Sequence, residues 1–171
     1  MTEVSIHPVK HSDAQDIIEA NMRSRDYHAP WAQPFTDMSG FDAWFGQLLT
    51  GPNAAFVARD GESRGIVGVF NLTEIVWGVF RSTYLGYYGM VDFARRGLMS
   101  EALRQVTHHA FDELGLHRIE ANIQPENRAS INLVRRIGFT KEGYSPSYLQ
   151  IGGVWCDHER WALISSQRHK V

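Results

Sequence analysis

The sequence predicts one mixed α/β domain, in which helices flank a mostly antiparallel sheet. Two observations lead to this fold class. Short apolar runs are separated by turn residues, as in hairpins, and two later segments carry apolar residues at helical spacing. The chain has 171 residues, 43% hydrophobic and 21% charged, which suits a single domain over 1–171 with a sizeable core. No internal repeat or domain boundary is visible.

The first half of the chain is predicted to hold a strand, two helices and a β-hairpin. A capping box of Ser12 and Gln15 marks the start of the first helix. The turn Asp60-Gly61-Glu62 marks the hairpin. In order, we expect a strand at 5–10, a helix from residue 12, a short helix at 40–49, and antiparallel strands at 53–60 and 66–76.

The second half is predicted to alternate strands with helices and to close on a hairpin. Gly86 and Gly89 lie inside the first of these strands, which predicts a bulge or the close approach of another group. Gly115 and Gly138 each end a helix. We expect strands at 83–92 and 119–124, helices at 98–114 and 128–137, and a hairpin of strands 143–151 and 154–164.

Composition excludes several classes of function. The formal net charge is −2 and the pI about 6.4, so a general affinity for nucleic acid is not expected. The single cysteine, Cys156, cannot form an internal disulfide and is interpreted as a packed thiol. No cysteine cluster or histidine pattern predicts a metal site, and no apolar run of ~18 residues predicts a membrane span. We therefore expect a cytoplasmic protein.

The most informative segment joins a strand to a helix at residues 91–102. Arg95, Arg96 and Gly97 come just before a helical pattern that starts at Leu98. Free backbone N–H groups, the positive end of a helix and two cations converge there, which favours a bound phosphate or pyrophosphate. The structural alternative is an ordinary turn with a solvated arginine pair. The segment is neither a P-loop nor a dinucleotide fingerprint.

Several short motifs follow one another through residues 84–164 in a distinctive order and spacing. They are Tyr84-Leu85-Gly86-Tyr87, Arg96-Gly97-Leu98-Met99-Ser100-Glu101-Ala102-Leu103, His117-Arg118-Ile119, Asn127-x-x-Ser130, Ile137-Gly138-Phe139, Glu142-Gly143-Tyr144 and Asp157-His158. In these motifs the chain resembles the GNAT superfamily of N-acetyltransferases, and within it the ribosomal-protein-alanine N-acetyltransferase (RimJ/RimL-like) branch.

The resemblance implies a GNAT fold whose two central strands, 83–92 and 119–124, splay apart around acetyl-CoA. The pyrophosphate motif of the family falls on residues 94–99, where Gly97 matches and Ala94 and Met99 depart from the usual residues. Backbone N–H groups of 95–100 are expected to bind the phosphates. The implied cofactor-binding residues are Met90, Val91, Asp92, Arg95, Arg96, Gly97, Leu98, Met99, Ser100 and Asn127.

The resemblance also implies catalytic roles near the start of the last helix. Asn127 is expected to contact the pantetheine arm, and Ser130 to protonate the leaving thiolate, because Val134 stands where many relatives have a tyrosine. The structural alternative is that Asn127 and Ser130 only cap the helix. A neutral amine would attack the thioester directly, with the oxyanion met by a backbone N–H near Met90 and Val91.

The general base remains open among four side chains, acting directly or through water. These are Glu120, which heads the prediction, Glu74, Tyr87 and Tyr88. An α-amine has a pKa near ~7.8 and a lysine near ~10.4, so neutralising them at pH 7 costs about 1 and about 4.6 kcal/mol. A site without a strong base therefore favours a protein N-terminus as acceptor.

The acceptor groove is predicted to be walled by Trp31, Phe35 and Tyr148, although packing of loop aromatics is an equal alternative. His158 belongs to a matching motif but is assigned no catalytic role. The expected acceptor is the N-terminal α-amine of a ribosomal protein. A polyamine, aminoglycoside or similar small amine is the alternative, and a non-catalytic acyl-CoA-binding module is a third. A homodimer is left open as a further partner.

Overall fold

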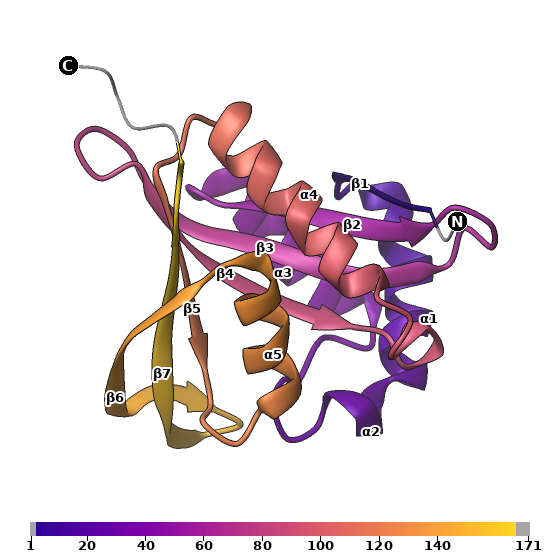
Figure 1. Ribbon diagram of the computed structural model, residues 1–171. Coiled ribbons are helices and arrows are strands. Elements are labelled where there is room, and N and C mark those ends of the chain that lie inside the picture. The colour runs from indigo at the N-terminus through magenta and orange to yellow at the C-terminus, as the bar shows by residue number, and fades with distance from the viewer. Residues whose placement is uncertain (1–2, 167–171) are drawn as a thin grey trace.

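The computed structural model describes residues 3–166, so residues 1–2 and 167–171 of the predicted domain lie outside the described residues. Seven strands form one sheet in the order β1-β2-β3-β4-β5-β7-β6 (Figure 1). Within the described residues only β4 and β5 pair in parallel, which confirms the predicted mixed and mostly antiparallel α/β fold class. The strands are β1 (Val4–Pro8), β2 (Ala54–Asp60), β3 (Ile66–Val76), β4 (Ser82–Gly89), β5 (Arg118–Ile123), β6 (Thr140–Ile151) and β7 (Val154–Ile164).

Helices cover both faces of this sheet. Figure 1 shows α4 (Leu98–Asp112) crossing one face and α5 (Arg128–Ile137) lying beside β5 and β7 on the same side. The opposite face carries α1 (Ala14–Arg23), α2 (Arg25–His28) and α3 (Met38–Thr50). Each face has its own apolar core: Leu103 and Ile119 belong to the first, and Ile17 and Phe41 to the second. Consecutive buried residues of β3 point to opposite faces, so that strand contributes to both: Phe70 and Leu72 to the first core, and Ile66 and Val69 to the second.

The structure differs from the local predictions at three points. The α2 turn was not predicted, because four residues next to two prolines give no periodic signal. The strand expected at 83–92 ends at Gly89 and continues as a 3-10 turn over Val91–Phe93. The predicted Ser12–Gln15 capping box is absent, because no side chain caps α1; instead the Asp13 carboxylate accepts a hydrogen bond from the Lys10 amide at 2.8 Å, at the start of a 3-10 turn over His11–Asp13.

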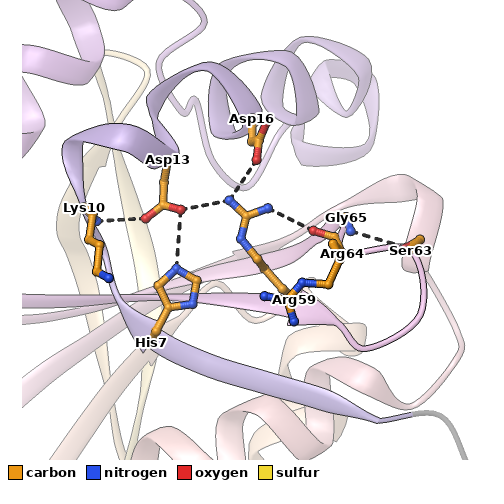
Figure 2. A network of polar contacts seen from close by, with 8 residues as sticks. All are labelled: His7, Lys10, Asp13, Asp16, Arg59, Ser63, Arg64 and Gly65. Atoms are coloured by element: carbon orange, nitrogen blue, oxygen red, sulfur yellow. Dashed lines mark hydrogen bonds and ion pairs between the residues drawn. The ribbon is translucent and has the colours of Figure 1, made fainter.

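A polar network ties the start of α1 to the hairpin of β2 and β3 (Figure 2). The Arg59 guanidinium donates to Asp13 and Asp16 at 2.8 Å each, and His7 Nε2 lies 3.3 Å from Asp13. Burial alone would raise the pKa of Asp13, but the hydrogen bonds from Arg59 and Lys10 hold it below its ordinary value. The network fixes the helical layer on the N-terminal half of the sheet.

No helix among the described residues is long and apolar enough to cross a membrane.

Candidate functional site

The parallel strands β4 and β5 pair at one end and separate at the other. Cα partners run only from Ser82↔Arg118 to Tyr84↔Glu120. Beyond them, Leu85–Gly89 of β4 and the rest of β5 form no ladder with each other. A cavity of about 690 Å³ occupies this opening and is lined by residues of β4, β5, α5 and the start of α4. The predicted splay of the two central strands is therefore present.

Glycines shape the β4 wall of the cavity. A Cβ on Gly86 would meet nothing within 4 Å, so the backbone there leaves open space. A Cβ on Gly89 would lie 3.1 Å from Met99 Sδ, and one on Gly68 would lie 2.5 Å from the same atom. These two glycines make room for the Met99 side chain, which explains how a large residue fits the position. The register of β3 with β4 runs without a shift from Gly68↔Gly89 to Thr73↔Tyr84, so Gly89 marks a close approach and not a bulge.

The turn before α4 presents a row of unpaired amides. Arg95 has φ 61° and Gly97 has φ 77°, both left-handed, and helical Leu98 follows. A left-handed residue next to a helical one forms the backbone concavity that binds anions. Within the described residues, the amides of 95–99 donate no hydrogen bond, and no side chain caps the helix. The Ser100 amide donates to the Gly97 carbonyl at 3.1 Å, so the predicted set of free amides stops one residue short.

Two arginines border this turn at the cavity. Arg95 lines the cavity from the turn, and Arg136 lines it from α5. Arg136 Nη1 donates to Ser100 Oγ at 3.2 Å, which holds its guanidinium at the start of α4. Arg96 lies away from the cavity, 3.8 Å from Asp60 and over the Phe93 ring. Unpaired amides, the positive helix end and two cations make this end of the cavity suited to phosphate groups.

A hydroxyl pair lies deeper in the cavity, where β4 faces α5. The Tyr87 hydroxyl is 2.5 Å from Ser130 Oγ. Burial raises the pKa of Tyr87 to about 12, although its hydrogen bond with Ser130 acts in the opposite direction. Tyr87 is therefore a neutral phenol at pH 7 and can donate a proton to Ser130. Asn127 Oδ1 accepts from the Ser130 amide at 3.2 Å, so the predicted helix cap is present and leaves the Asn127 NH2 group for another partner.

The other face of the sheet supplies a different set of side chains. Strand alternation places Asn122 and Gln124 opposite to Ala121 and Ile123, whose side chains lie on the α5 side. Three carboxamides line the cavity from this face: Asn71, Asn122 and Gln124. Trp44 Nε1 donates to Asn71 Oδ1 at 3.1 Å, and Asn122 Oδ1 is buried without a partner among the described residues.

Two histidines and Trp31 complete this side. His28 Nε2 donates to the Gly89 carbonyl at 2.8 Å, and its Nδ1 is buried without a partner. Burial lowers the pKa of His28 despite that carbonyl, so its ring is neutral. His158 Nδ1 donates to the Cys156 carbonyl at 2.9 Å. Among the described residues that line the cavity there is no aspartate or glutamate.

Comparison with known proteins identifies the family. The sequence family described as the acetyltransferase (GNAT) domain matches residues 3–140. The chain belongs to the GNAT acetyltransferase family.

Individual relatives agree with this assignment. The [ribosomal protein uS5]-alanine N-acetyltransferase of Escherichia coli is 35% identical over 162 residues, covering 90% of this chain and 83% of that protein. The structure of Mycobacterium smegmatis RimJ in complex with CoA-disulfide has a TM-score of 0.84 and 26% identity, over 98% of this chain and 84% of that one. A spermidine N-acetyltransferase from Vibrio cholerae, in complex with CoA and spermine, shares the fold with a TM-score of 0.81 and 20% identity, over 96% of each chain.

The chain is thus an N-acetyltransferase, and enzymes of the GNAT family use acetyl-CoA as acetyl donor. The cavity fits that molecule on three counts. The free amides of 95–99 suit its pyrophosphate, the open space at Gly86 admits a chain beside β4, and the orphan Oδ1 of Asn122 can accept from an amide N–H. When bound, acetyl-CoA supplies an activated acetyl thioester.

The structure brings eight of the predicted GNAT site residues to the cavity. They are Trp31, Met90, Arg95, Gly97, Met99, Ser100, Asn127 and Ser130. Their individual roles stay predictions.

Seven predicted residues do not line the cavity. The Asp92 carboxylate pairs with Arg23 at 3.1 Å, and Glu120 pairs with Arg118 at 2.8 Å. Phe35 packs on Phe41 and Trp44 in the second core. Val91 lies at the turn before α4, and Leu98 lies in the first core. Arg96 borders Asp60, and the ring centroid of Tyr148 is 6.4 Å from that of His158.

The expected oxyanion donors are corrected. The Met90 amide donates to the Val67 carbonyl at 2.9 Å and the Val91 amide to Ser24 Oγ at 3.0 Å, so both are already engaged. Because antiparallel amides alternate in direction, the Met90 bond implies that the amides of Tyr87 and Gly89 point away from β3, into the gap. These two amides replace Met90 and Val91 as candidate donors.

Two of the four candidate bases are tyrosines, and the structure disfavours them. Burial raises the pKa of both Tyr87 and Tyr88, so neither is an anion at neutral pH. Glu74 is exposed and, like Glu120, lies outside the cavity lining.

The sequence reasoning missed one complete helix face. Ala129, Asn132, Leu133 and Arg136 line the cavity from α5, at the spacing i, i+3, i+4 and i+7. The apolar stripe of α5 drew attention to its core side, where Ile131 and Val134 are buried. A signal for this face was present in the sequence. Ala129, Asn132, Leu133 and Arg136 form a second stripe of mixed polarity along the helix, which begins with a small residue and ends with an arginine.

Proposed function

We propose that this GNAT enzyme transfers an acetyl group to the N-terminal α-amine of a protein, with a ribosomal protein as the acceptor. One observation carries the choice of acceptor: within the described residues the cavity has no carboxylate, and neutral carboxamides line its acceptor face. Carboxamides can donate to and accept from a peptide backbone. A polyamine brings several positive charges, which need carboxylate partners when they leave water.

Proton chemistry supports the same acceptor. At pH 7, losing a proton costs an α-amine about 1 kcal/mol and a lysine-like amine about 4.6 kcal/mol. No carboxylate among the described lining residues can help with the larger cost. The name of the E. coli relative, an alanine N-acetyltransferase of a ribosomal protein, agrees with this choice.

A small amine is the second candidate. This candidate is supported by the fold that the chain shares with a spermidine N-acetyltransferase, although at 20% identity that likeness extends to the fold alone.

We propose that residues 1–171 form one N-acetyltransferase domain. A cytoplasmic location is proposed with the ribosomal acceptor, because ribosomal proteins are made and assembled there. The homodimer stays a prediction that sedimentation can check.

The test measures thiol release from acetyl-CoA with three acceptors side by side. These are an alanine-starting ribosomal-protein peptide, the same peptide with a blocked N-terminus and an internal lysine, and spermidine. We expect turnover with the first, little with the blocked peptide and little with spermidine. Faster turnover of spermidine would contradict the proposal. Binding of acetyl-CoA without turnover of any amine would return the chain to the non-catalytic alternative.

A further inference from the structure

His158 differs from every other titratable side chain at the acceptor face. It is 3% exposed and lines the cavity. Its Nδ1 donates to the Cys156 carbonyl, because a carbonyl can only accept. That bond fixes the neutral tautomer, with the proton on Nδ1 and a lone pair on Nε2.

The lone pair on Nε2 is available. No described residue donates to it, and it is not among the unpaired atoms that are sealed from solvent. His28 is the informative contrast. Its Nε2 is occupied by the Gly89 carbonyl and its Nδ1 is sealed, so His28 offers no reachable base.

The register of the strands places His158 across the gap from Ser130. Asn122 pairs with Arg160 and Ile123 with Glu159, so His158 lies beside Gln124, on the face that carries Asn122. Arg135 of α5 stacks on Trp161, three residues on and therefore on the other face. Ser130 approaches the cavity from that α5 side. The two residues thus border one cavity from opposite faces of the sheet.

We propose that His158 is the general base of the acetyl transfer, an inference that rests on the proposed function. As the acceptor nitrogen forms its bond to the carbonyl carbon and the C–S bond breaks, His158 Nε2 takes the proton that the nitrogen loses. The sulfur leaves as a thiolate and takes a proton from Ser130. Ser130 takes a proton from Tyr87, and Tyr87 regains its proton from solvent before the next turnover. The imidazolium then returns its proton to solvent. One proton leaves on the acceptor face and one arrives from the α5 face.

The surroundings favour this role over a purely structural one. The adjacent Asp157 carboxylate is engaged by the Tyr144 hydroxyl and the Ser147 amide of β6, and Tyr148 of the same strand packs near the ring. Among the described lining residues the only other imidazole is that of His28, which is neutral. Arg160 lies opposite Asn122 on the same face but does not line the cavity, and no described lysine or arginine lines the cavity from this face to oppose protonation of Nε2.

His158→Asn is the decisive variant. The asparagine amide can still donate to the Cys156 carbonyl as Nδ1 does, but it has no basic nitrogen. We expect kcat with the alanine-starting peptide to fall on the order of 100-fold, the usual contribution of a general base, with acetyl-CoA affinity and thermal unfolding close to wild type. His158→Ala should lose as much and regain activity when imidazole is added. His108→Gln, at an exposed position on α4, is the matched control and should neither lose activity nor respond to imidazole.

Two results would overturn the proposal. One is His158→Asn with wild-type kcat, and the other is His158→Ala that folds but gains nothing from imidazole. Should both variants fail to fold, the wild-type enzyme still decides: a crystal structure with coenzyme A and the alanine-starting peptide must place the peptide amine within hydrogen-bond reach of His158 Nε2, directly or through one water, and an amine held away from Nε2 rejects the role. A wild type that acetylates no peptide but acetylates spermidine would instead refute the proposed acceptor, and the same variants would then be read with spermidine.

Discussion

The two sides of the cavity differ in which chemical groups they present, mainly backbone amides on one side and side chains on the other. The α4–α5 side consists of backbone amides at 95–99, a helix end and a hydroxyl pair, most of them within two short segments. The acceptor side consists of side chains from residues as far apart as Trp31, Asn71, Asn122 and His158. Backbone sites depend on local turn geometry, whereas the acceptor side depends on the whole sheet being assembled. The first is therefore expected to be shared among relatives and the second to decide which amine enters.

The largest expected effect breaks the backbone side alone. Gly97→Val places a β-branched residue at φ 77°, where a Cβ would project into open space beside the free amides. We expect acetyl-CoA affinity to fall roughly 1,000-fold, as about 4 kcal/mol is lost with two charge-assisted hydrogen bonds. Calorimetry measures the change. Gly115→Val is the matched control, with the same left-handed strain at φ 66° beyond the far end of α4, and it should lose stability but keep affinity.

The second effect separates chemistry from binding on the same side. Ser130→Ala should lower kcat on the order of 100-fold with little change in acetyl-CoA affinity, because it removes the proton donor to the leaving sulfur. Tyr87→Phe should lower kcat less. The double variant should be no slower than Ser130→Ala, because both residues serve one path and their effects are not additive. If the losses in kcat are additive in steady-state kinetics, Ser130 and Tyr87 do not act in one proton-transfer path.

The third effect alters the acceptor side alone. Asn122→Asp adds a carboxylate to a cavity lining that has none among its described residues. We expect the ratio of kcat/KM for spermidine to that for the alanine-starting peptide to rise about tenfold, equivalent to roughly 1.4 kcal/mol. Asn132→Asp, on the α5 side of the same cavity, is the control and should leave that ratio nearly unchanged. A ratio that does not move in Asn122→Asp would show that charge at this face does not select the acceptor.

The smallest effect on activity comes from the polar network of Figure 2, away from the cavity. Asp13→Asn should cost about 3 kcal/mol of unfolding free energy at pH 7, because Arg59 loses its buried partner. The folded-state pKa of Asp13 is depressed, so its contribution is present above the unfolded pKa and is lost as pH falls through the folded value. The gap between variant and wild type in urea unfolding should therefore narrow below about pH 4. A gap that is constant with pH would assign the loss to packing.

The comparison also explains what the sequence could predict. Turn glycines, helix periodicity and the Arg95–Gly97 turn are local, and they led to the fold class, the helix at 128–137 and the phosphate end of the cavity. The acceptor-side residues come from distant parts of the chain and meet only when the sheet is assembled, so no local sequence pattern predicted that they lie together. Glu120 was favoured as the base because its residue type suits the role, yet its carboxylate pairs with Arg118 outside the cavity. Phe35 was likewise chosen by residue type, as a wall of the acceptor groove, yet its side chain packs against the second core. His158 Nε2 can be reached from the cavity because of the register between β5 and β7, which no short sequence motif predicts.

The central claim is that acetyl-CoA lies in the gap between β4 and β5 with its diphosphate at residues 95–99. A crystal structure with coenzyme A and an alanine-starting peptide tests it most directly. We expect phosphate oxygens within hydrogen-bond distance of those amides, the pantetheine arm beside Gly86, and the peptide amine on the face of Asn122 and His158. Coenzyme A bound outside the gap, or a diphosphate held away from the 95–99 turn, would contradict it.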